Sequence, residues 1–490
     1  MIRFLHGDEE VAIEAVQADT TVLEYLRRDR ACVGTKEGCA SGDCGACTVV
    51  QVSPDDEGLC YEPINACIAT LGGLHGKQLL CVENLAEDGQ LHPVQEAMVA
   101  CHGSQCGFCT PGFVMSLFAL YHRKDDAEYA EIIEALGGNL CRCTGYKPII
   151  AAAERALEHR DKDSFDHQRA ASTRDRLRAL ADTQEDTIAL ARGESRYFRP
   201  ATTQSLTALL REHEDARLLA GGTDLLLEVT QGLKTLDCLI DVRAVPDLAT
   251  IDVNRDVIEI GAAVTHRQAQ TTLLGDYPEL AELIERFGSL QIRSQGTVVG
   301  NIANASPIGD WPPTFLALNA SLVLESAQGR REIALDDFFL AYRKTALEPG
   351  EFIRSLKIPR RSGTLFLRAY KISKRFEDDI SSVCGVFALH LDGDRILRAR
   401  VAFGGMAAVP ARALACEAAL VGLSLRSDSL TACAAALDSA FQPISDARAS
   451  ATYRALVARR LLDRLQADFR GEATRVHTPA AAMQASAPAQ

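Results

Sequence analysis

The chain has 490 residues, of which 47% are hydrophobic and 24% charged, and its formal net charge is -14 at neutral pH. Domains average roughly 150 residues, so this length predicts three or four domains and excludes a mainly disordered, collagen-like or coiled-coil protein. A surface of this negative charge repels phosphate backbones, which argues against a nucleic-acid partner.

The chain lacks an uninterrupted apolar run of about 18 residues, so we expect no membrane-spanning segment. The first residues turn acidic at Asp8–Glu10, too early for a signal peptide. We therefore expect a cytoplasmic protein. Of its 16 cysteines, 12 fall within the first 143 residues, and in a reducing compartment this density favours metal binding over disulfides.

Residues 1–84 are expected to form a small α+β unit. Apolar residues alternate on both sides of the turn His6–Asp8, which predicts a β-hairpin. Thr21 and Glu24 form a capping-box pattern that should open a short helix through Leu26. A loop rich in glycine and cysteine follows over 34–47, and residues 48–52 then form a strand.

Residues 85–160 are expected to form a bundle of short helices. Pro93 suits a first helical turn, and Thr110 followed by Pro111 predicts an N-cap before an apolar stripe. The next helix should end at Gly137–Gly138, and another should run over 147–157.

The remaining chain divides at changes in composition. Residues 161–190 are highly charged and suggest a solvated linker, and 191–364 and 365–472 show mixed α and β patterns. The strands expected here cover 217–220, 239–242, 258–260, 365–369 and 401–403. The Ala/Pro-rich tail, 473–490, is expected to be disordered. The fold class predicted is a multidomain α+β protein.

The first cysteine group has the spacing typical of a plant-type [2Fe–2S] site. Its members are Cys39, Cys44, Cys47 and Cys67. Glycines between them allow left-handed backbone and let amide groups approach the sulfur atoms. A structural four-cysteine zinc site is the alternative, although zinc sites usually use two short cysteine pairs.

The second group consists of two pairs, each just before a predicted helix: Cys106 with Cys109, and Cys141 with Cys143. Helix N-terminal amides stabilise negative charge, and a tetrathiolate site is anionic. This group alone fits zinc as well as iron. The first group upstream favours a second iron–sulfur cluster. We interpret the other eight cysteines as small buried or incidental thiols.

These motifs together resemble the xanthine oxidase family of molybdenum hydroxylases. The resemblance rests on the stretches 38–47, 103–109 and 138–145 for the iron–sulfur half, 219–224 and 297–307 for the FAD domain, and 375–380 and 403–406 for the domain after it. It implies a plant-ferredoxin-like β-grasp domain (1–84), a helical [2Fe–2S] domain (85–160), a linker (161–190), a two-part FAD-binding domain (191–364) and a C-terminal α+β domain (365–472). One chain that joins the iron–sulfur and flavin parts without a molybdenum-binding domain is similar to the small subunit of bacterial xanthine dehydrogenases.

The resemblance also implies the flavin-binding residues. A glycine pair after a strand lets the backbone approach a pyrophosphate, with helix N–H groups facing it, although an ordinary turn would look the same. Matched to the family, this loop would wrap the FAD diphosphate, and a second loop and four single residues would contact FAD elsewhere. The residues concerned are Leu218, Leu219, Ala220, Gly221, Gly222, Thr223, Asp224, Leu225, Phe287, Thr297, Val298, Val299, Gly300, Asn301, Asp310, Ile353 and Lys371.

Two of these assignments have simpler alternatives. Phe287 after Ile284 also suits an ordinary core position, and a single lysine such as Lys371 is usually at the surface. A nicotinamide-binding motif is not visible, because the sequence contains neither G-x-G-x-x-G nor a Walker A motif. If NAD binds, we expect it against the exposed face of the flavin.

The function implied by the resemblance is electron transfer. Electrons from purine (hypoxanthine or xanthine) hydroxylation on a molybdopterin-binding large subunit would pass through the Cys106 group, then the Cys39 group, then FAD to NAD, in a 2:2 heterotetramer. No catalytic residue for purine oxidation is expected in this chain. The alternatives are the equivalent subunit of an aldehyde or N-heterocycle hydroxylase, a free-standing NADH diaphorase, and a non-redox zinc and nucleotide-binding scaffold.

Overall fold

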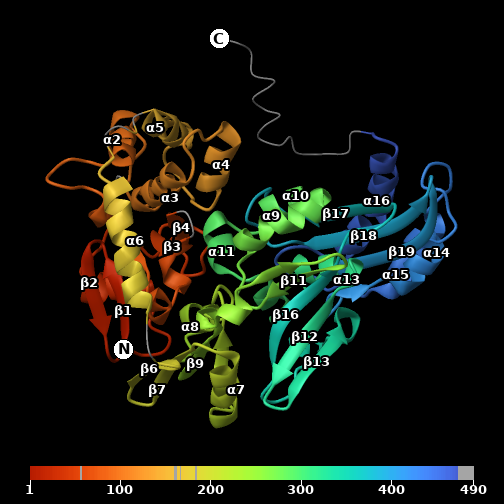
Figure 1. The fold of residues 1–490 in the computed structure, drawn as a ribbon. Coiled ribbons are helices and arrows are strands. Elements are labelled where there is room, and N and C mark those ends of the chain that lie inside the picture. The colour runs from red at the N-terminus through yellow and green to blue at the C-terminus, as the bar shows by residue number, and fades with distance from the viewer. Residues whose placement is uncertain (56–57, 159, 161–162, 166, 183–184, 473–490) are drawn as a thin grey trace. The chain divides into compact units, whose positions relative to one another are not determined.

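The computed structural model describes residues 1–55, 58–158, 160, 163–165, 167–182 and 185–472 (Figure 1). The expected disordered tail, 473–490, lies outside these residues. The chain divides into two compact units, which we describe separately. The described part of the first contains Met1–Val245 and Ser289–Gly296, and the second contains Pro246–Gly288 and the residues from Thr297 onward.

The first unit begins with a five-stranded sheet in the order β2-β1-β5-β3-β4, in which β1 and β5 are parallel. The predicted hairpin at His6–Asp8 is present, and Thr21 caps the first helix with the expected reciprocal bonds to Glu24. The elements are β1 (Ile2–His6), β2 (Glu9–Ile13), α1 (Val22–Glu24), β3 (Thr48–Pro54), β4 (Leu59–Asn65) and β5 (Gln78–Leu80).

Four short helices follow, and they share a core with one face of β3. These are α2 (Pro93–Ala100), α3 (Thr110–Arg123), α4 (Tyr129–Gly137) and α5 (Lys147–Leu157), as expected from the sequence. One detail differs, because Cys109 and not Thr110 occupies the N-cap position of α3. The N-cap of this helix is therefore itself one of the predicted metal-binding cysteines.

The segment predicted to be a solvated linker contains the helix α6 (His167–Ala181), which runs alongside the first sheet (Figure 1). Leu177 and Leu180 of α6 are buried with Leu5 of β1. Although the segment is highly charged, Leu177 and Leu180 are three residues apart, and this spacing places both on the same face of a helix. The linker is thus packed against the domain that precedes it.

A four-stranded sheet in the order β6-β7-β9-β8 completes the first unit. Its elements are β6 (Thr187–Arg192), β7 (Ser195–Pro200), α7 (Thr203–Glu212), β8 (Arg217–Leu219), α8 (Leu227–Thr230) and β9 (Cys238–Asp241), and α11 (Leu290–Gln295) belongs to the same unit. Its apolar side chains join the core of the first sheet. The helix expected directly after Gly221–Gly222 begins only at Leu227, because turns occupy the residues between them.

The second unit contains an antiparallel sheet in the order β10-β11-β16-β12-β13 and a second sheet in the order β17-β18-β19-β20. In the first sheet the strands are β10 (Ile251–Val253), β11 (Val257–Gly261), β12 (Ser321–Ser326), β13 (Gly329–Ala334) and β16 (Phe352–Pro359), with a small hairpin of β14 (Phe339–Ala341) and β15 (Lys344–Thr345). The second sheet consists of β17 (Leu365–Ile372), β18 (Val383–Asp392), β19 (Arg395–Gly404) and β20 (Ala411–Arg412).

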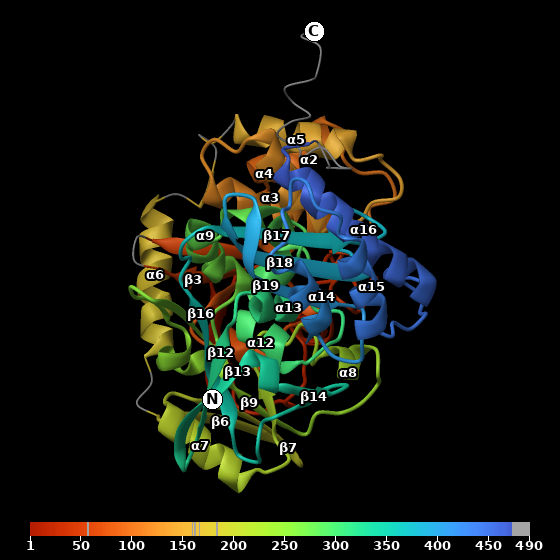
Figure 2. The same ribbon diagram turned by 90° about the vertical axis from the view of Figure 1, so that its right-hand side faces the viewer.

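Helices cover both sheets of the second unit (Figure 2). They are α9 (His266–Asp276), α10 (Ala281–Glu285), α12 (Val298–Ala303), α13 (Trp311–Ala317), α14 (Leu414–Leu420), α15 (Thr431–Ala440) and α16 (Ala451–Phe469). α12 packs on β11 and β16, and α13 packs on β18 and β19. Both units thus have the mixed α+β architecture that the sequence predicts.

Candidate iron–sulfur and flavin sites

The first cysteine group lies in a loop and a turn at the end of the first sheet. Cys47 directly precedes β3, and Cys67 lies in a 3-10 turn after β4. Both are buried, and their sulfur atoms are 3.3 Å apart. The loop that carries Cys39 and Cys44 continues along the chain into Cys47, one member of this buried sulfur pair.

Donors surround the sulfur of Cys39. The backbone amides of Ser41 and Cys44 each donate to it at 3.4 Å. The thiol of Cys44 and these amides lower the pKa of Cys39 to about 4. A loop that stabilises a thiolate in this way fits a tetrathiolate metal site.

Gly45 keeps this loop close to the helical domain. Its φ is 66°, and a Cβ atom there would lie 2.2 Å from the carbonyl oxygen of Gly138. A side chain at this position would therefore clash with backbone atoms as well as strain the turn. The glycine permits the two cysteine-bearing loops to touch.

The second group brings its two pairs together at the ends of helices. Cys109 is the N-cap of α3, and Cys141 and Cys143 precede α5. The thiols of Cys106 and Cys143 shift each other's pKa, and so do those of Cys109 and Cys141. Burial acts to raise the pKa of Cys141, but bonds from Thr144 and the local backbone outweigh it and lower that pKa. The four sulfur atoms fit a second anionic cluster, and two of them are solvent-exposed.

Hydrogen bonds join the loops that carry the two cysteine groups. The amide of Leu140, next to Cys141, donates to the carbonyl oxygen of Cys44 at 3.0 Å. The side chain of Asn139 donates to the carbonyl oxygen of Gly45 at 3.1 Å. The side chain of Gln291 in turn donates to Asn139 at 3.2 Å. The loops that present the two sets of cysteines are therefore directly linked.

The glycine-pair loop of the predicted flavin site contacts the turn that carries Cys67. The side-chain amide of Gln295 donates to the carbonyl oxygens of Ile68 and Gly221, at 2.7 Å in each case. A Cβ atom at Gly221 would lie 2.4 Å from the carbonyl oxygen of Gln295, so only glycine fits. Within the first unit, the Cys39 group thus lies between the Cys141 loop and the predicted diphosphate loop.

The amides of this loop suit an anionic group, although its structure differs from the expected helix start. Among the described residues, the N–H groups of Thr223 and Leu225 have no backbone acceptor. The carbonyl of Gly222 accepts from Leu226, so the turn already has a helical hydrogen bond. Unpaired N–H groups at the start of such a turn are suited to bind a pyrophosphate.

The other predicted flavin residues belong to the second unit. Thr297 caps α12 by accepting from the amide of Gly300 at 3.0 Å. Asn301 follows in the same helix, and among the described residues its buried Oδ1 atom has no hydrogen-bond partner. A buried acceptor of this kind fits a ligand that donates to it. Ile353 lies on β16 beside Leu324, and it is buried.

Two of the predicted flavin residues form a buried ion pair. The Nζ atom of Lys371 lies 2.6 Å from Oδ2 of Asp310, and Ser381 donates to Oδ1 of the same carboxylate at 2.5 Å. The Lys371 side chain is only 3% exposed. The lysine is therefore not at the surface, and each charge compensates the other.

Phe287 packs in an aromatic group that includes the single tryptophan of the chain. Its ring lies 4.5 Å from His266 and 5.8 Å from Trp311, measured between centroids. Sequence reasoning did not select Trp311, Gln291, Gln295 or Asn139 for a role. Most of their contacts join residues far apart in the chain. Local spacing is visible only for Gln291 with Gln295 and for Trp311 with Phe315, each pair being four residues apart.

Four family models match consecutive parts of the chain. They are a 2Fe-2S iron-sulfur cluster binding domain (residues 4–72), a [2Fe-2S] binding domain (81–154), an FAD binding domain in molybdopterin dehydrogenase (192–361) and a CO dehydrogenase flavoprotein C-terminal domain (368–468). The chain therefore contains two [2Fe–2S] domains and an FAD-binding domain. A zinc-stapled scaffold does not agree with these matches.

Solved structures extend the likeness to three dimensions. A Cu,Mo-CO dehydrogenase is 30% identical, with 55% of this chain and 94% of that chain covered and a TM-score of 0.52. A carbon monoxide dehydrogenase from Hydrogenophaga pseudoflava is 29% identical, with 56% and 98% covered and a TM-score of 0.53. The chain belongs to the xanthine oxidase family of molybdenum hydroxylases.

Curated members of this family are longer proteins. The chain is 33% identical to the xanthine dehydrogenase of Emericella nidulans over 483 residues, which cover 86% of this chain and 35% of that protein. It is 31% identical to the xanthine dehydrogenase/oxidase of Rattus norvegicus over 455 residues, which cover 83% of this chain and 34% of that protein. The chain thus spans about a third of the length of these relatives. In its described part, no helix is both long and apolar enough to cross a membrane.

Proposed function

We propose that this chain is the electron-transfer subunit of a xanthine dehydrogenase. It would carry electrons from purine hydroxylation, at a molybdenum centre on a partner subunit, through two [2Fe–2S] clusters to FAD and then to NAD. The observation that supports this order is the chain of contacts in the first unit. The Cys141 loop bonds to the Cys44 loop, and the turn of Cys67 shares Gln295 with the glycine-pair loop.

The residues of this chain would bind the iron–sulfur clusters and exclude water from them. Iron–sulfur clusters transfer single electrons, and flavin connects single-electron to hydride transfer. We propose that Cys39, Cys44, Cys47 and Cys67 hold one cluster and that Cys106, Cys109, Cys141 and Cys143 hold the other. Donors to the sulfur atoms stabilise the thiolates, and burial of Cys47 and Cys67 excludes water from one side.

For FAD we propose two groups of contacts. The segment 218–225 would bind the diphosphate through the amides of Thr223 and Leu225, and the segment 297–301 would supply a second loop. Phe287 and Ile353 would also contact the flavin. Asp310 and Lys371 would contact it too, since their buried ion pair holds both side chains in fixed positions.

The partner and the acceptor follow from the same proposal. A molybdopterin-binding large subunit would complete the enzyme as a 2:2 heterotetramer in the cytoplasm, and NAD would accept electrons at the flavin. An equivalent subunit for another substrate is the second candidate. It is supported by a 27% identical solved structure, the quinoline 2-oxidoreductase of Pseudomonas putida 86, with a TM-score of 0.51.

The test is to purify the chain anaerobically, alone and with a co-expressed molybdopterin-binding partner. We expect about four irons and one FAD per chain, two distinct [2Fe–2S] EPR signals after reduction, and xanthine-dependent NAD reduction only with the partner. Turnover of an aldehyde or N-heterocycle in place of xanthine would favour the second candidate. A colourless chain, or one that contains only zinc, would refute both.

A further inference from the structure

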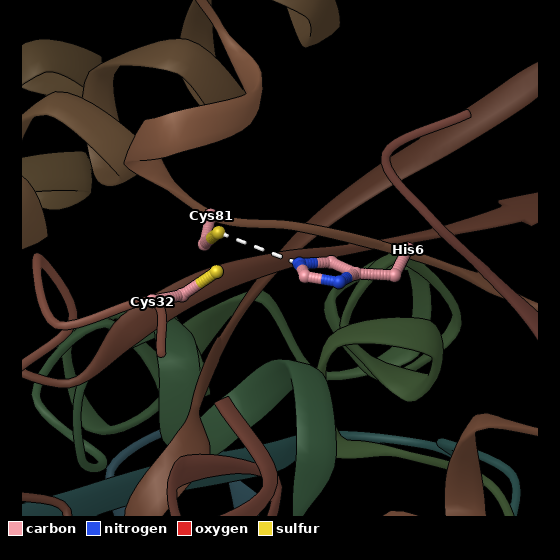
Figure 3. A group of neighbouring side chains, drawn as sticks. All are labelled: His6, Cys32 and Cys81. Carbon is pink, nitrogen blue, oxygen red and sulfur yellow. Dashed lines mark hydrogen bonds between the residues drawn. The ribbon is translucent and has the colours of Figure 1, made fainter. Parts of the chain in front are cut away.

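A third group of side chains that could bind a metal lies at the first sheet, apart from the two cysteine sets assigned above. It consists of His6 at the end of β1, Cys32 in the loop before the first cluster segment, and Cys81 directly after β5 (Figure 3). One ligand atom from each residue lies within 4.8 Å of the other two. Figure 3 shows the three side chains pointing toward one another.

The spacing of these atoms suits a metal ion. Nε2 of His6 is 3.7 Å from Sγ of Cys81, and Sγ of Cys32 lies within 4.8 Å of both atoms. For a tetrahedral zinc ion, with bonds of about 2.3 Å to sulfur and about 2.05 Å to nitrogen, a sulfur and a nitrogen ligand atom would be about 3.6 Å apart. The His6–Cys81 pair thus already has the separation that a shared ion requires.

Burial explains why these polar groups gain from an ion. Cys81 is fully buried and His6 is 5% exposed, and Cys32 is half-buried. Among the described residues, Nδ1 of His6 has no hydrogen-bond partner. With a proton on Nδ1, the lone pair of Nε2 faces Cys81, which is the tautomer that a metal ligand needs.

The donor types of the group favour such an ion. Two thiolates and one imidazole form a borderline-soft donor set. Two thiolates neutralise a divalent cation, so the buried part of such a site would carry little net charge.

A second cluster in the same unit shows why the histidine tautomer matters. His92 and His122 both approach Asp163, with Nε2 to carboxylate distances of 3.3 and 3.7 Å. However, Nδ1 of His92 accepts from the amide of Val94, so a neutral ring carries its proton on Nε2. That protonated nitrogen faces Asp163, and it has no lone pair for a metal.

We propose that His6, Cys32 and Cys81 bind one thiophilic divalent ion, zinc. Binding would release the thiol protons and fasten three segments to one another: the ends of β1 and β5, and the loop that leads from Cys32 to Cys39. This proposal is independent of the electron route proposed above.

The test uses the full chain, purified anaerobically with its clusters and titrated with zinc alone. We expect one tight zinc per chain beyond the iron, and a zinc-edge X-ray absorption spectrum with two sulfur ligands at about 2.3 Å and nitrogen or oxygen at about 2.0 Å. An all-sulfur shell would mean that zinc has entered a cluster site, and it would overturn the proposal.

Variants separate this site from the others. Cys32→Ser and His6→Gln should each weaken zinc binding roughly tenfold or more, with iron and FAD contents unchanged. Cys60→Ser, in β4 of the same sheet, is the matched control and should bind zinc as the wild type does. Equal zinc binding by all three variants would refute the proposal. Anaerobic protein in which Cys32 and Cys81 form a disulfide, seen as a mass lower by two hydrogens, would also refute it.

Discussion

At the scale of single residues, Cys141 gives the sharpest test of the proposed route. We expect Cys141→Ser in the complete enzyme to reduce purine-to-NAD activity to background, because Cys141 is a proposed ligand of the cluster that we propose receives electrons from the partner. NADH oxidation by an artificial dye should persist, since the glycine-pair loop and the Cys39 group are untouched. Steady-state assays of both activities measure this, and Cys101→Ser at the end of α2 is the control. Loss of both activities to the same degree would contradict the assigned order.

The Asp310–Lys371 pair makes a second prediction about residues. Lys371→Met leaves a buried carboxylate with only the Ser381 bond, and removal of one partner of a buried pair costs about 3–5 kcal/mol. We expect a lower urea midpoint and a lower FAD content. The double variant Asp310→Asn with Lys371→Met should recover most of the stability, because no buried charge remains. If the double variant is as unstable as the single one, packing and not charge explains the loss.

At the scale of elements, the helix α3 links stability to pH through His122. This side chain is 9% exposed and stacks on Tyr61 at 4.5 Å, and burial lowers its pKa to about 4. In the unfolded chain His122 takes up a proton near pH 6.5, whereas in the folded chain it does so only near pH 4. The free energy of unfolding therefore decreases as the pH falls from 6.5 toward 4. Between pH 7 and pH 5 the loss is about 2 kcal/mol.

The variant His122→Gln should remove this part of the acid sensitivity. Asp163 raises the pKa of His122, whereas His92 and Arg160 lower it. All three residues are left unchanged in the variant, so that only the imidazole of His122 is removed. Urea unfolding at pH 7 and pH 5, with the iron content followed in parallel, measures the difference. A wild-type and a variant curve that fall equally with pH would contradict the role of His122.

The elements that the sequence predicted are those with local signals. The turn at His6–Asp8, the capping box at Thr21 and the proline at the start of α2 each act within a few residues, and the structure confirms them. The helix α6 was missed, because its stability depends on burying Leu177 and Leu180 against β1 and not on its own charged sequence. The residue pattern of one segment does not show whether another segment, here β1, provides an apolar surface for it to pack against.

The same distinction applies to the sites. The cysteine sets are recognisable because three of the four ligands of the first lie within nine residues, and the family models support both. Gln295 and Gln291 were not predicted, since their partners lie more than 70 residues away in every case. The flavin residues stay predictions, although the free amides at Thr223 and Leu225 and the buried Oδ1 of Asn301 agree with them.

At the scale of the whole molecule, the chain combines the parts needed to move electrons but matches only about a third of its curated relatives. We therefore expect the chain expressed alone to oxidise NADH with a dye as acceptor and to leave xanthine unchanged. Addition of a molybdopterin-binding partner should restore xanthine-dependent NAD reduction, because the substrate reaction belongs to that partner in our proposal. Stopped-flow absorption of the clusters and flavin, with xanthine or NADH as reductant, separates the two entry points. Reduction of the isolated chain by xanthine would show that this chain itself oxidises the purine. It would refute our proposal that purine hydroxylation takes place on the partner subunit.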